Sequence, residues 1–467
     1  MNVVNLLLTP VYTAFLSPTD YGNIGLLLLF SPLAKIGFRM GLESGFLRVY
    51  YDLDATQQPR FVSSVALFSA ASSSLLFALV VSVRAPLALW LLGDPGRGDW
   101  IVLSAADVYL GAFSFVPQRL LQIQSRPGLF SSFAIFRHAT NAALKVTFLV
   151  QGRGVTGVLW SDALTTALFA VVLAPTLLRE ARWGWERKAL ARALDFGLPK
   201  VPHGLLLQVQ NMADRRILAG FVERAQVGLY HQGYTVGQGI KFALSAFEPA
   251  WQPFVYAQIG RPEAPRTLAR IVTYVWAGFV GAALPLAIFG RELLMLLTWR
   301  NHAFWAAAPV VPVVVLAYAL QGAFLLGSIG IGIEKKARYY PLITAVTASL
   351  NVAANLALIP RYGMLGAAWA TVIAYLVMAS LGTWISHRLY PIPLEAGRLA
   401  AISLAALGCW SLSLLAPQAS LAALAVKTAA MLGFPALLLA LRVPTAEEWS
   451  WLRKRLRREP AGANSGV

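Results

Sequence analysis

Apolar runs of about 20 residues recur along this chain, and short segments rich in Gly, Pro and Asp separate them. A helix of that length spans the hydrocarbon core of a bilayer. Breaks fall at turn-forming sequences such as LSPTDYG, GDPGRGD and GRPEAP. The pattern predicts an all-α polytopic membrane protein with about fourteen transmembrane helices, at roughly 1–16, 22–50, 61–83, 100–122, 128–150, 155–178, 196–220, 228–252, 268–290, 305–332, 339–359, 364–386, 398–416 and 420–441.

Composition supports the membrane interpretation. Hydrophobic residues make up 57% of the chain and charged residues 13%, whereas a soluble globular protein carries about 25% charged residues. The mean hydropathy is +0.61. One cysteine, Cys409, allows neither a disulfide framework nor a cysteine metal site, so we expect no metal and no other cofactor.

The sequence lacks the motifs of common enzymes. It contains no P-loop, no HExxH pair and no nucleophile elbow. We therefore expect a protein that is not an enzyme and that does not itself hydrolyse ATP.

The net charge of +18 gives an orientation. Cytoplasmic connections of membrane proteins are enriched in Lys and Arg. If residues 17–21 lie outside, alternation of the following spans places most of the basic connections in the cytoplasm. Both termini are then cytoplasmic, which requires an even number of spans. Nucleic-acid binding is not expected, because the chain has no separate basic soluble domain.

Two cytoplasmic segments have amphipathic patterns. Residues 179–192 (REARWGWERKALAR) join the two halves of the chain, and residues 445–458 begin with the capping-box pair Thr445 and Glu448. Both patterns are typical of basic helices that lie on an anionic leaflet.

A weak internal repeat divides the chain. Tyr21-Gly22 corresponds to Val227-Gly228, and the GVTG sequence from Gly154 corresponds to the GMLG sequence from Gly363, at separations of 206 to 209 residues. Transporters commonly contain such repeats, with a substrate site between them. We expect two pseudo-symmetric six-helix lobes (1–178 and 196–386), a basic amphipathic linker (179–195), two extra transmembrane helices (387–441) and a basic cytoplasmic tail (442–467).

Charges within the spans are concentrated in the first eight. The last six contain essentially only Lys427, which we expect to extend to the lipid headgroups. Charges at membrane depth usually line a pathway or a ligand site. The charged positions of the first eight spans are Lys35, Arg39, Glu43, Arg48, Asp107, Arg119, Arg137, Lys145, Asp162, Lys200, Asp214, Arg215, Lys241 and Glu248.

The second span has a charged face and a glycine face. In a continuous helix, which turns 100° per residue, Lys35, Arg39 and Glu43 share one stripe. The glycines at positions 37, 41 and 45 lie roughly opposite, where they would let a neighbouring helix approach closely.

Three further spans carry polar stripes. On each of these helices the polar side chains share one face. Isolated side chains that each extend to the membrane surface would not align in this way. The alignment predicts a water-filled cationic cavity between helices. The stripes comprise Arg137, Asn141 and Lys145; Lys200, His203, Asn211, Asp214 and Arg215; and Tyr234, Gln238, Lys241, Ser245, Glu248 and Gln252.

These stripes also have structural explanations. Arg39 and Glu43 are four residues apart and can form a neutralising pair. Asp214 with Arg215 can form a gate or a helix cap. His203 can carry a proton or serve as a hydrogen-bonded packing residue.

Four stretches, in order along nearly the whole chain, carry a family resemblance. They are LLLTPVYTAFLSPTDYGNIGLLLLFSPL with MGLESGFLRVYYD, and residues 213–240, 247–258 and 359–377. Together they resemble bacterial polysaccharide flippases of the Wzx type, within the multidrug/oligosaccharidyl-lipid/polysaccharide exporter (MOP) superfamily. The resemblance implies two six-helix lobes with two extra helices, and a central cavity lined mainly by the first, second, seventh and eighth spans.

The resemblance also implies a function. We expect alternating access that moves a polyprenyl-pyrophosphate-linked oligosaccharide across the bacterial inner membrane, with membrane lipids and the polysaccharide polymerase machinery as further partners. The cations expected to attract the pyrophosphate and any acidic sugars are Lys35, Arg39, Arg137, Lys145, Arg215 and Lys241. The carboxylates expected to balance them, or to couple transport to protons or sodium, are Glu43, Asp214 and Glu248.

Other functions stay open from the sequence. A multidrug cation exporter of the same superfamily would share the fold, although an excess of cavity cations disfavours cationic drugs. A membrane polysaccharide polymerase or ligase would be expected to carry a large outer loop, which this chain lacks. A non-transporting scaffold for polysaccharide assembly is a third alternative.

Overall fold

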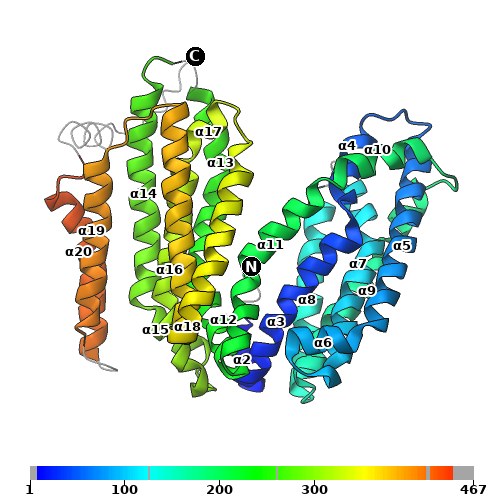
Figure 1. Ribbon diagram of the computed structural model, residues 1–467, viewed down its shortest axis with the longest axis horizontal. Helices are drawn as coiled ribbons and strands as arrows, with labels where there is room; N and C mark the ends of the chain where they lie inside the picture. Colours follow the sequence, from blue (N-terminus) through cyan, green and yellow to red (C-terminus); the bar gives the residue numbers. More distant parts are fainter. Residues whose placement is uncertain (1–7, 125–126, 259–260, 417–420, 445–467) are drawn as a thin grey trace, which may run out of the picture. The chain divides into compact units, whose positions relative to one another are not determined.

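A computed structural model describes residues 8–124, 127–258, 261–416 and 421–444 of the protein (Figure 1). Throughout these ranges the regular elements are helices, and no β-strand occurs. Nine helical segments in the described part are long and apolar enough to cross a membrane. The predicted all-α, multi-span fold is therefore confirmed, whereas the number fourteen stays a prediction.

Short connections join the helices. The first half of the chain contains α2 (Thr9–Phe15), α3 (Pro18–Arg39), α4 (Leu42–Tyr50), α5 (Gln58–Ser82), α6 (Arg84–Leu92), η1 (Pro95–Arg97), α7 (Gly98–Ile123), α8 (Pro127–Val150), α9 (Gly154–Glu180) and α10 (Arg187–Gly197). The second half contains α11 (Lys200–Phe221), α12 (Arg224–Gly237), η2 (Gln238–Ile240), α13 (Lys241–Gln258), α14 (Ala264–Ile288), α15 (Gly290–Leu297), η3 (His302–Ala307), α16 (Val310–Gly327), α17 (Ile329–Ile333), α18 (Tyr339–Leu389), α19 (Ala396–Leu414) and α20 (Leu421–Ala440).

The LSPTDYG sequence starts α3 through a capping box. The Ser17 hydroxyl accepts a hydrogen bond from the Asp20 backbone N–H at 3.2 Å, and the Asp20 carboxylate accepts one from the Ser17 N–H at 3.0 Å. Pro18 occupies the first helical position, where a missing N–H costs no intrahelical hydrogen bond. These contacts satisfy backbone donors that the first turn leaves without partners.

The expected continuous helix over residues 22–50 is interrupted. Met40 and Gly41 both have positive φ values, 48° and 72°, so α3 ends at Arg39 and α4 begins at Leu42. A Cβ atom on Gly41 would overlap the backbone of Gly197, and one on Gly45 would overlap the backbone of Ala193. A Cβ atom on Gly37 would meet no neighbour within 4 Å, so only two of the three glycines mediate a close approach.

The linker helix also differs from its prediction. Instead of beginning near residue 179, the helical segment α10 begins at Arg187, and residues 181–186 form no helix. Gly184 has a φ of 151°, which a continuing α-helix would not allow. Ala189 and Ala193 of α10 are fully buried in a core cluster with Phe46 of α4. The linker therefore packs on the helical bundle through one face, in addition to any contact with a leaflet.

The eighth expected span, 228–252, is not one α-helix. A 3₁₀ turn, η2, separates α12 from α13. A 3₁₀ helix turns by 120° per residue instead of 100°, so positions before and after it do not keep a common α-helical phase. The predicted stripe from Tyr234 to Gln252 is therefore broken at residues 238–240.

The glycines of the internal repeat occupy equivalent backbone environments. Gly22 of α3 and Gly228 of α12 face each other so closely that a Cβ on Gly228 would lie 2.8 Å from the Gly22 nitrogen. Gly154 and Gly363 have φ values of 51° and 54°. Gly363 introduces a kink within α18, where the sequence predicted the boundary between two spans. These matches agree with the repeat, while the two-lobe domain division stays a prediction.

The chain forms two compact units. Unit 1 comprises Met1–Val236, Leu293–Val310 and Tyr340–Ala374, and one of its cores contains the stacked rings of Phe46 and Phe61, whose centroids are 5.4 Å apart. Unit 2 comprises Gly237–Glu292, Val311–Tyr339 and Tyr375–Val467, and one of its cores contains Trp251 and Phe279. The expected tail helix at 445–458 lies outside the described residues.

Polar contacts tie α19 and α20 to their neighbours in unit 2. Glu395, at the start of α19, accepts hydrogen bonds from Thr273 at 2.6 Å and from Arg398 at 2.7 Å. Lys427 of α20 lies 2.5 Å from the carboxylate of Glu292 on α15. The expectation that Lys427 extends to the lipid headgroups is therefore wrong, because a carboxylate on a neighbouring helix pairs with it.

Candidate functional site

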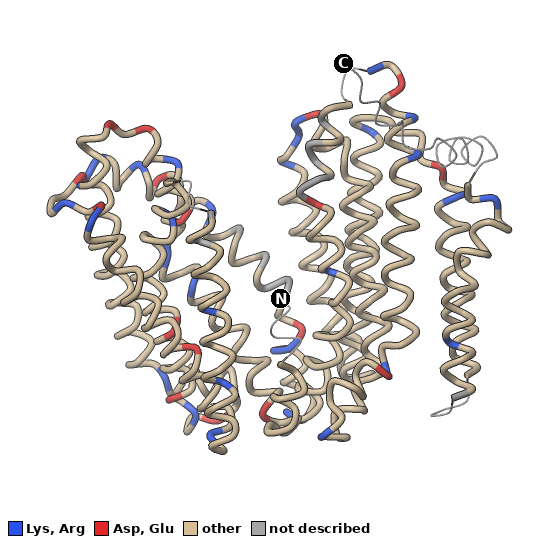
Figure 2. Tube along the Cα trace, turned by 180° about the vertical axis from the view of Figure 1, so that it is seen from behind, with Lys and Arg blue, Asp and Glu red and all other residues tan. Residues whose placement is uncertain are grey.

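A cavity of about 420 Å³ lies within unit 1, between α3, α7, α8 and α9. In Figure 2, charges of both signs occur between the ends of the helices as well as at the ends. The polar residues that line the cavity are Ser31, Asp107, Gln118, Arg137, His138, Asn141, Lys145, Asp162, Thr165 and Thr166. Two of the predicted substrate-binding cations, Arg137 and Lys145, are therefore in this site.

Lys145 on α8 is paired inside the cavity. Its ammonium lies 2.8 Å from Oδ1 of Asp162 on α9, and its side chain is 11% exposed. Asn141, one turn earlier on α8, donates to the same oxygen at 2.9 Å and to the Thr165 hydroxyl at 3.3 Å. The Asp162 carboxylate thus neutralises the Lys145 ammonium, and the Asn141 amide holds that carboxylate in position.

A second polar chain crosses from α7 to α8 through a threonine of α9. The Thr166 hydroxyl donates to Oδ1 of Asp107 at 2.5 Å and accepts from Nη2 of Arg137 at 3.1 Å. The Arg137 guanidinium also lies 5.9 Å from the centre of the Phe169 ring, which adds a cation–π attraction. Thr166 therefore links the two opposite charges without a direct ion pair.

A cationic cluster, defined as Lys35, Arg39 and Arg119 with Glu43, lies beside this cavity. Arg39 and Arg119 both pair with Glu43, the second at 3.6 Å, and the Arg39 guanidinium also lies over the Phe115 ring. The break at Met40–Gly41 does not separate Arg39 from Glu43. Three cations and one carboxylate leave an excess of two positive charges in the cluster.

Lys35 connects the cluster to the cavity. Ser31 of α3 lines the cavity, and Lys35 and Arg39 lie one and two turns further along the same face of that helix. The Lys35 side chain is exposed, and it forms neither an ion pair nor a hydrogen bond with any residue in the described ranges. Arg39 contributes a buried Nε that likewise has no hydrogen-bond partner among the described residues.

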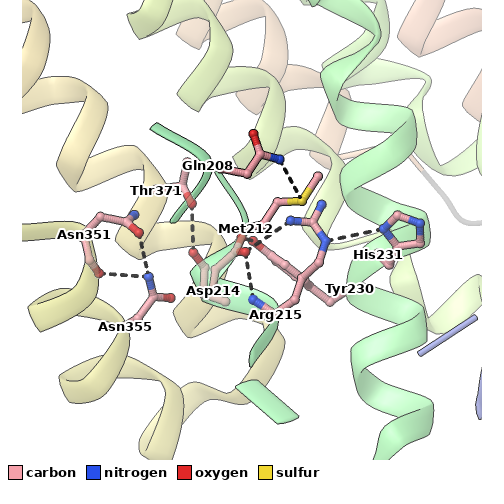
Figure 3. A network of polar contacts seen from close by, with 10 residues as sticks. Gln208, Met212, Asp214, Arg215, Tyr230, His231, Asn351, Asn355 and Thr371 are labelled. Atoms are coloured by element: carbon pink, nitrogen blue, oxygen red, sulfur yellow. Dashed lines mark hydrogen bonds and ion pairs between the residues drawn. The ribbon is translucent and has the colours of Figure 1, made fainter. Parts of the chain in front are cut away.

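Asp214 and Arg215 lie in a different, buried network of unit 1 (Figure 3). Oδ1 of Asp214 accepts from the Arg215 backbone N–H at 2.8 Å and from its Nη1 at 3.1 Å, and each side chain is 5% exposed. The Tyr230 hydroxyl donates to Oδ2 at 2.5 Å. Arg215 also donates to Nδ1 of His231 at 3.5 Å and lies over the Tyr234 ring at 4.7 Å.

The network extends to α18. Thr371 hydrogen-bonds the Tyr230 hydroxyl, and on the same helix Asn355 donates to the backbone oxygen of Asn351 at 2.8 Å. The side chains of His203 and Asn211, which the sequence placed on one stripe with Asp214, lie outside the described part.

Lys241 and Glu248 lie on α13 in unit 2. Both side chains are exposed, and Lys241 lies 5.9 Å from the centre of the Tyr318 ring. Neither forms an ion pair with another residue in the described ranges. Their assignment to a substrate site stays a prediction.

The site that the sequence predicts does not include Asp107, Asp162 and Thr166. Both aspartates stand among the charges within spans, but neither belongs to one of the predicted polar stripes. Positions 162, 165, 166, 169 and 173 follow the helical spacing of one face, and all five line the cavity. That spacing is the signal in the sequence that could have identified them.

The comparisons with known proteins concern family and fold. A family model described as "Polysaccharide biosynthesis protein" matches residues 11–253, which include every residue of the cavity and the cationic cluster. No curated protein matches the sequence.

Solved structures share the fold at low sequence identity. The lipid II flippase MurJ in an inward closed conformation matches with a TM-score of 0.74 and 13% identity, over 94% of this chain and 96% of that chain. An inward-facing multidrug resistance MATE transporter of the MOP superfamily matches with a TM-score of 0.62 and 16% identity, over 83% of this chain and 94% of that chain. An outward-facing MATE transporter of that superfamily matches with a TM-score of 0.54 and 14% identity, over 84% of this chain and 92% of that chain. The predicted MOP-type fold is confirmed.

Proposed function

This chain belongs to the polysaccharide biosynthesis protein family, and on that premise we propose that it is a flippase for a polyprenyl-pyrophosphate-linked oligosaccharide in the bacterial inner membrane. The observation that carries the proposal is the cationic cluster beside a polar cavity, within the part of the chain that the family model matches. The family indicates polysaccharide biosynthesis, and the positive charges of the cluster complement an anionic pyrophosphate headgroup.

The cationic cluster has the properties that a pyrophosphate needs. It has two positive charges in excess, an exposed lysine without an ion pair in the described part, and a buried Arg39 Nε–H without an acceptor there. Arginine binds phosphate oxygens through a planar set of donors, and lysine acts as a point charge. In a cavity of low dielectric, such attraction exceeds its value in water.

Alternating access is the transport mode that we propose. Its support is the fold, which occurs in both inward-facing and outward-facing transporter structures. Lys241, in unit 2, is a further candidate cation for substrate binding. Glu43 and Asp214 would balance neighbouring arginines, since each is engaged in ion pairs, and Glu248 is the remaining candidate for ion coupling.

A multidrug cation exporter is the second candidate, because the fold is shared with MATE transporters. The charge of the site argues against it. A cationic drug approaching Lys35, Arg39 and Arg119 would meet two positive charges in excess, and like charges in a poorly screened cavity repel strongly.

Reconstitution tests the flippase proposal. Proteoliposomes containing a fluorescent polyprenyl-pyrophosphate oligosaccharide should show leaflet transfer, and a Lys35→Ala/Arg39→Ala variant should transfer at least about tenfold more slowly. Each charge-assisted hydrogen bond contributes about 1.5–3 kcal/mol, and 1.4 kcal/mol corresponds to tenfold.

Arg48→Ala is the matched control. Arg48 lies on α4, its side chain is 62% exposed, and it pairs with Asp52 away from the cluster, so transfer should stay at the wild-type rate. Transfer equal to that of empty liposomes would contradict the flippase proposal. An unchanged rate in the double variant would contradict the role of the cluster.

A further inference from the structure

We propose that the cavity between α3, α7, α8 and α9 is a sugar subsite that accepts an uncharged pyranose ring, the one attached to the pyrophosphate. This inference rests on the proposed function and adds the chemical class of the proximal sugar. It differs from the expectation drawn from sequence, in which Arg137 and Lys145 attract acidic sugars.

The charges of the cavity cancel, unlike those of the cationic cluster. Arg137 and Lys145 provide two positive charges, and Asp107 and Asp162 provide two negative charges. Lys145 is held 2.8 Å from Asp162, and Arg137 is linked to Asp107 through the Thr166 hydroxyl. No net positive field remains in the cavity to attract a sugar carboxylate.

Accessible acceptors remain at both aspartates. Every hydrogen bond and ion pair of Asp107 and Asp162 in the described part uses the Oδ1 atom, so each Oδ2 is available to a ligand. An ionised carboxylate only accepts hydrogen bonds. A sugar hydroxyl supplies the matching donor, and the Gln118 amide, which also lines the cavity, can both donate and accept.

The remaining wall suits the apolar face of a sugar ring. Phe133 and Leu28 line the cavity together with the buried Phe169. Small-molecule sites combine such apolar walls with a few convergent polar groups, and their volumes are typically about 300–1,000 Å³. The cavity, at about 420 Å³, is within that range.

Lys35 links the subsite for the pyrophosphate, at the cationic cluster, to the subsite for the sugar, in the cavity. Ser31 of α3 lines the cavity, and Lys35 and Arg39 follow it at intervals of one turn on the same face of that helix. A pyrophosphate held by Lys35 therefore presents its attached sugar to Asp107 and Arg137. A uronic acid ring in this place would bring its carboxylate into a cavity whose two cations are already balanced by Asp107 and Asp162. The carboxylate would lose water without gaining a counter-charge, and that cost confers specificity.

The test compares two ligands that differ at one carbon. Polyprenyl-pyrophosphoryl-glucose and polyprenyl-pyrophosphoryl-glucuronate are titrated against the detergent-solubilised full-length protein, and both are assayed for leaflet transfer in proteoliposomes. The wild-type protein should bind the glucose compound at least about tenfold more tightly. Asp107→Asn keeps the shape of the side chain and should reduce that preference severalfold, whereas Asp52→Asn on the surface should not change it.

The outcomes separate the two proposals. Equal affinity for the two compounds, with both transferred, overturns the sugar subsite and leaves the flippase function standing. Absence of transfer for both compounds overturns the flippase function, and the preference for the glucose compound in binding then tests the sugar subsite alone. Competition by free glucose as strong as that by the lipid-linked compound overturns the assignment to the lipid-linked substrate. An Asp107→Asn variant that retains the full preference overturns the role of the carboxylate.

Discussion

Asp214 and Arg215 are neighbours in the chain, and each side chain is 5% exposed. The aspartate accepts hydrogen bonds from Arg215 and from Tyr230, so both of its oxygens are engaged. Arg48 and Asp52 also form a pair, at 3.6 Å, but their side chains are 62% and 44% exposed. Water screens the exposed Arg48–Asp52 pair but not the buried Asp214–Arg215 pair. Two aspartate–arginine pairs therefore contribute unequally to the stability of the fold.

Asp214→Ala should lower the free energy of unfolding by about 3–5 kcal/mol, because it removes the carboxylate that Arg215 and Tyr230 both contact in a buried network. Asp52→Ala, the control, should lower it by less than about 1 kcal/mol. Thermal unfolding of the two variants in detergent measures the difference. Equal losses would show that the Asp214 network contributes no more than a surface pair.

The glycines of the α3–α4 segment have different surroundings despite their regular spacing. Gly41 has a φ of 72° and lies against the backbone of Gly197, whereas Gly37 lies within α3 with open space around it. The close approach fixes α4 on α10, which places Glu43 beside Arg39 and Arg119. The helix break thus positions part of the cationic cluster.

Gly41→Ala should therefore destabilise the protein by about 1–3 kcal/mol, through a left-handed backbone at a non-glycine residue and overlap with the neighbouring chain. Gly37→Ala should be neutral or stabilise it by up to about 1 kcal/mol, because alanine has less backbone entropy to lose in a helix. Melting temperatures in detergent test the pair. A reversed order would mean that the start of α4 does not meet α10 as described.

Membrane orientation is a property of the complete set of spans, and the charge distribution predicts it. The α9–α10 connection is expected in the cytoplasm and the α8–α9 connection outside. Trp183 in the first connection is 88% exposed, Gln151 in the second is exposed, and the native Cys409 is buried. These positions allow the orientation to be measured with single cysteines.

In a Cys409→Ser background, Gln151→Cys should react with a membrane-impermeant maleimide in intact spheroplasts. Trp183→Cys should react only after permeabilisation. The reason is that basic connections are retained in the cytoplasm during insertion. The opposite labelling pattern would reverse the predicted topology, and labelling of both positions from one side would contradict the number of spans between them.

The sequence determined the helices, their approximate limits and the positions of the charges within them. Each of these follows from local physics: the apolar length needed to cross a bilayer, and turn-forming residues that end a helix. It also identified Arg39 with Glu43 as a candidate pair, because the two residues are only four positions apart.

Only the tertiary structure decided which distant groups meet. Lys145 pairs with Asp162, Lys427 pairs with Glu292, and the Thr166 hydroxyl links Arg137 to Asp107. Helical phase gives the direction of a side chain about its own axis, but not the identity of the helix it faces. A charge inside a membrane takes its role from that neighbour, because the low dielectric makes a nearby partner decisive.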